Sequence, residues 1–160
     1  IHSLPDKRDF YYLTDTSADE SAQLEREYIA AHTDMLREFG DFDVVGHIGY
    51  PHRYGNFFNG AMTKYRAEFA ELFTALAHSG KGIELNTSGL YSSDHGGALP
   101  TPELLKLFRE CGGEIVTLGS DAHRAADVGK GLAEGAALLR EAGFTRYAVF
   151  ERREARFVKL

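Results

Sequence analysis

The stretch Ile115-Val116-Thr117-Leu118-Gly119-Ser120-Asp121-Ala122-His123 decides how this chain is interpreted. Its first four residues are apolar or β-branched, which is typical of a short buried strand. Asp121 and His123 follow at positions i and i+2, so in an extended or tightly turning segment their side chains point the same way. A carboxylate and an imidazole together at a strand end suit a divalent metal ion. On its own, however, an Asp-x-His also fits a turn aspartate beside a surface histidine.

Strands and helices alternate along the rest of the chain. Apolar residues at intervals of three and four predict helices over about 21–39, 61–78, 101–111 and 130–142. Apolar runs that end in polar loops predict strands over 42–47, 82–86 and 114–118. Two further runs, 147–150 and 155–160, flank a polar turn and predict a terminal β-hairpin. This alternation predicts an α/β fold with a parallel sheet, and crossovers of about 35 residues favour a (β/α) barrel.

The predicted strands are too few to close a barrel. The chain also begins at Ile1-His2 without a methionine, like the interior of a longer polypeptide. We therefore expect residues 1–160 to form a single domain that is the carboxyl-terminal portion of a barrel, with its amino-terminal strands missing.

The composition favours some classes of protein over others. A chain of 160 residues with 43% apolar and 12% aromatic residues predicts one globular domain. A formal net charge of -6 argues against broad binding to nucleic acid or to an anionic membrane. No apolar run is long enough to span a membrane, and no signal peptide is evident. The single cysteine, Cys111, is expected to fill the core and suits the reducing cytoplasm, where we expect the protein to be located.

Further polar residues lie at the predicted carboxyl ends of strands. These are His2, His47 and Asn86, in addition to Asp121 and His123. Loops at that end of a barrel converge, so these side chains should line one cleft. Their nitrogen and oxygen donors suit Zn, Mn or Fe better than Ca.

The other histidines are assigned no part in this site. We expect His32 and His78, which lie on predicted helices, to be surface or cap residues. His52 and His95 lie in predicted loops.

Four segments carry motifs that occur together in one known family. They are Ile1-His2-Ser3-Leu4, Val44-Val45-Gly46-His47-Ile48-Gly49-Tyr50 running to Arg53-Tyr54-Gly55, Ile83-Glu84-Leu85-Asn86-Thr87-Ser88-Gly89, and Gly119-Ser120-Asp121-Ala122-His123. In this order they resemble histidinol-phosphatases of the polymerase and histidinol phosphatase (PHP) superfamily, from the middle of the family's domain to its carboxyl terminus. The resemblance implies a distorted (β/α)7 barrel, with up to three divalent metal ions at the carboxyl ends of its strands.

The resemblance also implies roles for particular residues. His2, His47, Asp121 and His123 match metal ligands of the family. Many relatives have Asp where Gly49 stands, at a position that is not a ligand in the family. The family's opening His-x-His, its next histidine and its bridging glutamate would all lie upstream of Ile1.

The implied chemistry is hydrolysis of a phosphate monoester, most specifically of L-histidinol phosphate in histidine biosynthesis. Metal ions lower the pKa of a bound water and neutralise charge on the phosphate. Arg53 is the candidate phosphate clamp, since its planar fork can donate two charge-assisted hydrogen bonds, although a solvated loop arginine is the alternative. Asn86 either positions a ligand or substrate hydroxyl, or bonds the local backbone. Either Asp121 or His123 could protonate the leaving alkoxide.

Two other functions remain open at this point. One is a PHP-type phosphoesterase that acts on another small phosphate ester or a nucleotide. The other is a PHP-type domain that binds metal or supports structure without turnover.

Overall fold

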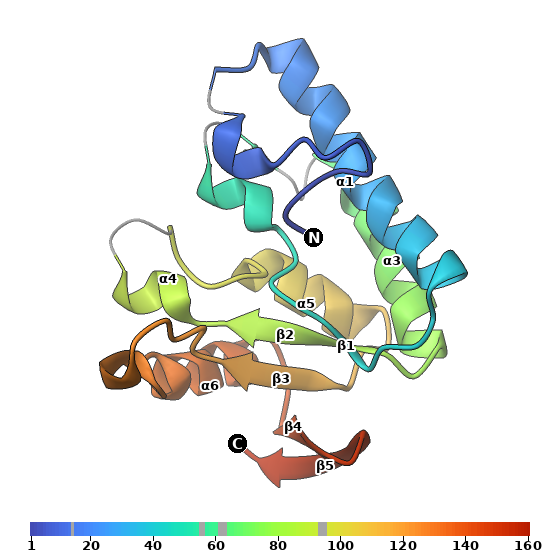
Figure 1. The fold of residues 1–160 in the computed structure, drawn as a ribbon. Coiled ribbons are helices and arrows are strands. Elements are labelled where there is room, and N and C mark those ends of the chain that lie inside the picture. Colours follow the sequence, from blue (N-terminus) through green and yellow to red (C-terminus); the bar gives the residue numbers. More distant parts are fainter. Residues whose placement is uncertain (14, 55–56, 61–63, 93–95) are drawn as a thin grey trace.

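A three-stranded parallel sheet forms the centre of the fold in the computed structural model, which describes all residues except 14, 55–56, 61–63 and 93–95. Strands β1 (Val44–Val45), β2 (Gly82–Asn86) and β3 (Val116–Gly119) lie in the order β1-β2-β3 (Figure 1). The register sets Val44 opposite Gly82 and Ile83 opposite Val116. The predicted α/β class with a parallel sheet is therefore confirmed. The strands are shorter than expected, and β1 keeps only two of the residues predicted over 42–47.

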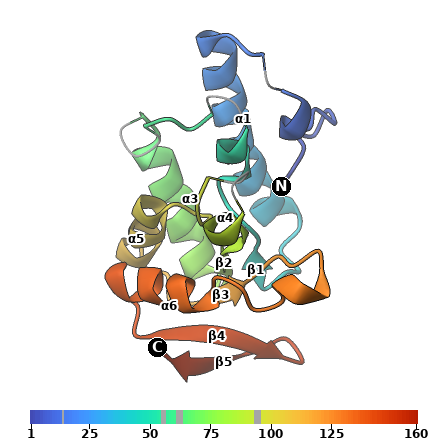
Figure 2. The same ribbon diagram turned by 90° about the vertical axis from the view of Figure 1, so that its left-hand side faces the viewer.

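Among the described residues, four helices of nine residues or more accompany this sheet. They are α1 (Ala18–Glu38), α3 (Arg66–His78), α5 (Pro102–Glu110) and α6 (Leu132–Glu141). Helix α1 packs on α3, α3 packs on α5, and α6 packs on β3. Figures 1 and 2 show α1 and α3 rising from one end of the sheet. Residues 61–63 of the helix predicted over 61–78 lie outside the described residues.

Short helical turns follow the strands and connect the longer elements. They are α4 (Ser88–Tyr91) and the 3₁₀ turns η1 (Phe10–Tyr12), η2 (Tyr50–Arg53) and η3 (Ala125–Asp127). None of them was predicted, because one turn of helix is too short to show a periodic apolar pattern. Turns η2, α4 and η3 follow β1, β2 and β3 respectively, so they surround the carboxyl ends of the strands.

Successive side chains of β2 point alternately into the core and to the opposite face of the sheet. Ile83 and Leu85 are fully buried, whereas Glu84 and Asn86 point to the other face. Aromatic and leucine side chains from the helices fill the space beside Ile83 and Leu85. They include Phe69, Phe73, Leu76, Leu104, Leu105 and Phe108. Cys111 lies half-buried against this core, as expected of a filler residue.

The predicted hairpin is present as β4 (Arg146–Glu151) and β5 (Glu154–Lys159), which pair antiparallel. Its two turn residues, Arg152 and Arg153, have φ values of 53° and 67°, the left-handed geometry of a type I′ turn. Arg153 donates hydrogen bonds to Asp41 and Asp43, just before β1. The hairpin, which lies below the sheet in Figure 2, is thereby tied to the segment that leads into the first strand.

The interpretation of His32 as a surface or cap residue is wrong. His32 is 1% exposed, and its ring packs edge-on against Tyr28 with 4.5 Å between centroids. Its Nδ1 lies 2.9 Å from the Tyr28 carbonyl oxygen. His32 belongs to the buried stripe of α1 because it stands four residues beyond Tyr28. His78 does lie exposed in the last turn of α3, and His95 falls outside the described residues.

Across the part of the chain that the structure describes, no helix combines the length and apolar character that a membrane span requires.

Candidate active site

A cavity of about 750 Å³ opens at the carboxyl ends of the parallel strands. His47 follows β1, Ser88 follows β2 and Asp121 follows β3, so the strand ends bring residues distant in sequence to one place. Five of the six predicted site residues line it: His2, His47, Arg53, Asp121 and His123. Residues outside the predicted set also line it, among them Tyr50, Tyr54, Ser88, Tyr91, Asp127 and Lys130.

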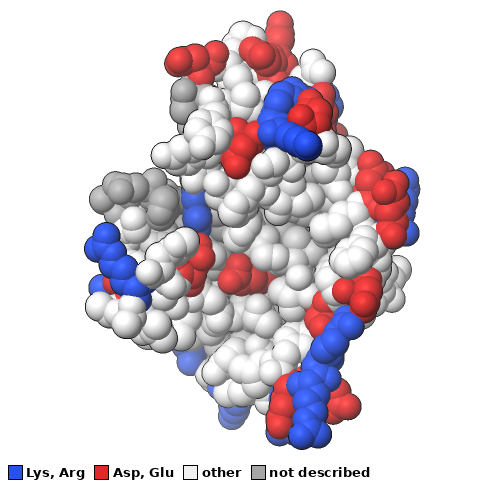
Figure 3. Space-filling view, viewed as in Figure 1, with Lys and Arg blue, Asp and Glu red and all other residues white. Residues whose placement is uncertain are grey.

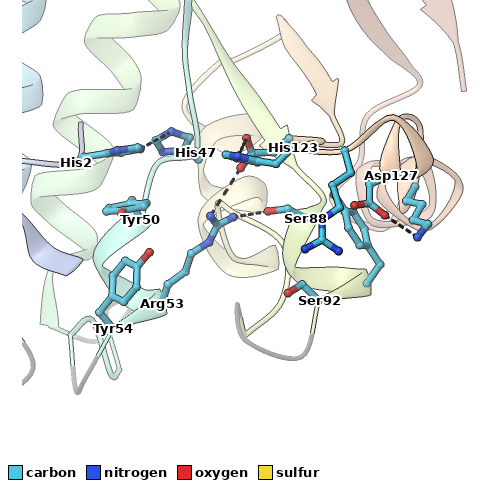
Figure 4. Close-up of a pocket in the computed structure, with 13 residues that line it drawn as sticks. His2, His47, Tyr50, Arg53, Tyr54, Ser88, Ser92, His123 and Asp127 are labelled. Carbon is cyan, nitrogen blue, oxygen red and sulfur yellow. Dashed lines mark hydrogen bonds and ion pairs between the residues drawn. The ribbon is translucent and has the colours of Figure 1, made fainter. Parts of the chain in front are cut away.

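His2 and His47 form one pair of potential metal ligands. Their Nε2 atoms lie 3.2 Å apart, and Figure 4 shows the two rings side by side. Two nitrogens bound to one tetrahedral zinc ion at 2.0–2.1 Å would be about 3.3 Å apart, so this spacing fits two ligands of a single ion. Burial lowers the pKa of His47 to about 4, and burial also lowers the pKa of His2. Both imidazoles are therefore neutral near pH 7, as a metal ligand must be.

Asp121 and His123 form a second pair. Asp121 Oδ1 lies 3.5 Å from His123 Nε2, and the His123 side chain is largely exposed. Burial by itself would raise the pKa of Asp121, but a hydrogen bond from Asn86 and the charge of Arg53 lower it overall. The carboxylate is therefore ionised near neutral pH and able to bind a cation.

The two pairs do not meet around one point. Among the described residues, no group of three or more His, Cys, Asp or Glu side chains is arranged so that it could hold a metal ion. Each pair by itself nevertheless has the donor chemistry and spacing of two adjacent ligands, so the residues present fit a divalent metal. The remaining ligands of any such ion would have to come from other groups.

Arg53 stands between the pairs as a buried cation. Its side chain is 5% exposed, which excludes the solvated loop arginine considered above. One terminal nitrogen donates to Asn86 Oδ1 at 3.0 Å and to Ser88 Oγ at 2.8 Å. The other lies 3.9 Å from Asp121 Oδ2. Figure 4 shows the guanidinium directed towards Ser88. The second terminal nitrogen is thus available to an anion in the cavity.

Asn86 lies beneath the cavity and does not line it. It is 1% exposed, and its Oδ1 accepts from the backbone N–H of Ser88 at 3.1 Å and from Arg53. Of the two roles left open by the sequence, this arrangement favours bonding to the local backbone, together with support for Arg53.

Two residues of this network escaped the sequence analysis. Ser88 bonds Arg53, and Glu84 accepts a hydrogen bond from the backbone N–H of His47 at 3.0 Å. A signal for Glu84 was present, because a charged residue in the middle of an otherwise buried strand needs polar partners.

The fold and cavity define an α/β protein with His, Asp and Arg side chains at the carboxyl ends of its parallel strands. No family model matches the chain. It is 31% identical over 149 residues to the probable histidinol-phosphatase of Thermotoga maritima, across 91% of this chain and 61% of that protein. It is 30% identical over 130 residues to the histidinol-phosphatase of Lactococcus lactis subsp. lactis, across 80% of this chain and 48% of that protein.

Solved structures agree with this relationship at the level of the fold. The crystal structure of histidinol phosphate phosphatase from Lactococcus lactis subsp. lactis, complexed with zinc, L-histidinol and phosphate, matches with a TM-score of 0.72 at 24% identity, over 98% of this chain and 59% of that chain. The putative histidinol phosphatase of Listeria monocytogenes matches with a TM-score of 0.63 at 18% identity, over 79% of this chain and 52% of that chain.

The chain is therefore similar in sequence to the histidinol-phosphatases, as the four sequence motifs indicated, and it shares the fold of the part of them that it covers. It spans 61% of one of these curated relatives and 48% of the other.

Proposed function

We propose that this chain is the carboxyl-terminal part of a metal-dependent phosphatase that hydrolyses L-histidinol phosphate to L-histidinol and phosphate. The observation that carries the proposal is the cavity in which two pairs of potential metal ligands flank the buried guanidinium of Arg53. The relatives named histidinol-phosphatase support the substrate, and zinc, L-histidinol and phosphate in the Lactococcus structure support the combination of metal and ester.

In this proposal, His2 and His47 hold one side of a divalent metal centre, and Asp121 and His123 hold the other. A bound metal ion would lower the pKa of a coordinated water and would place positive charge beside the phosphate. Zinc is the first candidate, with Mn and Fe as alternatives, and a cluster of up to three ions requires further ligands outside this set.

The chain's own residues orient the ester. Arg53 donates to a phosphate oxygen from its second terminal nitrogen, the one that lies 3.9 Å from Asp121, while Asn86 and Ser88 hold the first in place. The leaving alkoxide needs a proton. Of the two candidates, Asp121 is ionised near neutral pH, which leaves His123 as the candidate donor.

The incomplete sheet is part of the same proposal. Within the described residues β1 pairs only with β2, so its other edge is where further strands of a distorted (β/α)7 barrel would attach. Those strands would bring the remaining metal ligands from upstream of Ile1. The single domain of residues 1–160 is then the second part of the barrel.

The expected partner is a small phosphorylated molecule in the cytoplasm, with neither nucleic acid nor membrane as a partner. Figure 3 supports this, because Lys and Arg are interspersed with Asp and Glu on the face that it shows and form no broad basic surface.

The test is an assay of the full-length protein that contains this chain. After removal of metal, it should release phosphate from L-histidinol phosphate only when Zn²⁺ or Mn²⁺ is restored. His47→Ala and Asp121→Asn should abolish this activity, whereas the exposed His78→Ala should retain it. Metal-independent release, or full activity in both site variants, would refute the proposal.

A second candidate is hydrolysis of another small phosphate ester or a nucleotide. The tyrosines Tyr50, Tyr54 and Tyr91 line the cavity and could stack on any planar ring, not only on imidazole. Comparing kcat/KM for L-histidinol phosphate with that for nucleoside monophosphates distinguishes the two. Metal binding without turnover of either would identify a non-catalytic domain.

A further inference from the structure

The carboxylate of Glu84 connects two parts of the site that are distant in sequence. Glu84 points from the middle of β2 to the same face as Asn86. Its Oε2 accepts the backbone N–H of His47 at 3.0 Å and lies 3.4 Å from Asn86 Nδ2. Asn86 Oδ1 in turn accepts from Arg53 at 3.0 Å. One carboxylate therefore touches the backbone of a candidate metal ligand and, through one amide, the candidate phosphate clamp.

The neighbouring strands leave room for this carboxylate. A Cβ built on Gly119 would lie 2.1 Å from Glu84 Oε1, and one on Gly46 would lie 3.6 Å from Oε2. Neither glycine has a φ in the left-handed region, so the backbone conformation does not require glycine at these positions. The absence of a side chain at 119 is instead explained by the close approach of Glu84.

The backbone of His47 needs the hydrogen bond that Glu84 provides. Its φ of 27° places a non-glycine residue in a sparsely populated backbone region. Conformations of this kind persist only when surrounding contacts hold them. A charge-assisted bond from the His47 N–H to Glu84 holds this backbone, and with it the direction of the imidazole.

We propose that Glu84 is a positioning residue that fixes both His47 and Arg53 to strand β2, and that Gly119 serves to admit its carboxylate. The hydrogen bonds of Glu84 do not depend on the proposed function, whereas their consequence for catalysis rests on it. Glu84 acts through the two other side chains and need not touch substrate or metal.

The experiment measures Zn²⁺ affinity and the affinity for inorganic phosphate, both by calorimetry on the full-length protein. Glu84→Gln should weaken Zn²⁺ binding about 10- to 100-fold, the usual cost of losing a partner of a metal ligand, and should also weaken phosphate binding. Gly119→Ala should do the same without altering any charge, because the added methyl displaces the carboxylate. Asn86→Ala should weaken phosphate binding, because Arg53 loses an acceptor, and should lower Zn²⁺ affinity less than Glu84→Gln does, because Asn86 bonds Asp121 but not His47.

Two control variants separate positioning from general loss of stability. Glu25→Gln alters another carboxylate that accepts a backbone N–H, that of Phe58, but away from the cavity. Gly40→Ala adds a methyl whose nearest neighbour is 3.9 Å away. Both controls should keep wild-type affinities whatever their melting temperatures.

The results distinguish this inference from the proposed function. If Glu84→Gln and Gly119→Ala both bind Zn²⁺ and phosphate like wild type, Glu84 is not a positioning residue, even if the protein is a histidinol-phosphatase. If wild type fails to hydrolyse L-histidinol phosphate but both variants lose affinity for Zn²⁺ and phosphate, the inference holds and the substrate is wrong.

Discussion

Arg53 is a buried cation whose hydrogen bonds leave part of its guanidinium unsatisfied. Its Nε is buried and has no partner among the described residues, and the nearest carboxylate, on Asp121, is 3.9 Å away. Burying a charge is costly unless it is paired and hydrogen-bonded. An anion in the cavity, as proposed above for phosphate, would offset part of this cost.

Replacement of Arg53 should therefore affect substrate and not metal. Arg53→Ala is expected to lower kcat/KM about 100-fold or more, with unchanged metal content. Arg53→Lys should recover little, because an ammonium cannot reproduce two fixed donor directions. Steady-state kinetics and elemental analysis check this, with the exposed Arg37→Ala as control. Wild-type kinetics in Arg53→Ala would remove Arg53 from the mechanism.

His32 provides a pH-dependent prediction. Burial lowers its pKa from the ordinary 6.5 to about 3. The unfolded chain thus takes up a proton at His32 as the pH falls below about 6.5, while the folded protein does not. The stability associated with neutral His32 is complete above that pH and is lost progressively towards pH 3, with a slope of up to about 1.4 kcal/mol per pH unit.

This slope can be measured by denaturant unfolding between pH 4 and pH 7. In His32→Leu, the slope of the unfolding free energy against pH should be smaller by the contribution of one proton, whatever the stability of the variant at pH 7. His78→Gln, at the exposed end of α3, should keep the wild-type slope. Identical slopes for wild type and His32→Leu would mean that His32 takes up its proton in the folded state as readily as in the unfolded chain.

At the scale of elements, α1 supports the segment that carries His47. The Tyr28 hydroxyl accepts the backbone N–H of Gly49 at 3.0 Å, and Gly49 has a φ of 93° at the start of η2. This bond connects the middle of α1 to the turn that follows β1. The direction of His47 thus depends on a helix that contributes no residue to the lining of the cavity.

Tyr28→Phe should consequently destabilise the protein by about 1–3 kcal/mol, because it leaves the buried N–H of Gly49 without an acceptor. The free energy of unfolding from denaturant titration measures the effect. Tyr12→Phe, which changes a tyrosine that is 78% exposed, should cost almost nothing. Equal stabilities of Tyr28→Phe and wild type would show that water or another group satisfies Gly49.

The elements themselves were largely predictable from sequence, because they depend on local patterns. Period-3.6 runs located α1, α3, α5 and α6, and short apolar runs located the strands and the hairpin. The error at His32 arose from treating polar residues as external, although its spacing from Tyr28 placed it on the buried stripe. Ser21 and Glu25 lie on the same stripe for the same reason.

The contacts within the site were less predictable, because they join positions that only the tertiary fold brings together. Glu84 meets His47 across 37 positions, and Arg53 meets Asn86 across 33. No periodic pattern encodes such pairs. Motif resemblance identified candidate residues, but not which side chain supports which.

At the scale of the whole molecule, the open edge of β1 leads to a prediction about the 160 residues expressed alone. An unpaired strand edge favours aggregation or association with further strands, such as those proposed above. Under the same proposal, these residues alone also lack the further ligands of the metal cluster. It should be inactive and unfold without cooperativity, as judged by light scattering and thermal unfolding beside the full-length protein. A monomeric, cooperatively folded and metal-dependent phosphatase would show that the domain boundary is misjudged.

The bonds of Arg153 to Asp41 and Asp43 have a further consequence for how the protein is made. They join residues 112 and 110 positions apart. A ribosome synthesises the chain from the amino terminus, so the segment before β1 emerges long before its partner in the hairpin exists. During translation, that segment must remain unattached to the hairpin or be held by other contacts. In that interval the carboxylates of Asp41 and Asp43 lack the guanidinium that pairs with them in the folded protein.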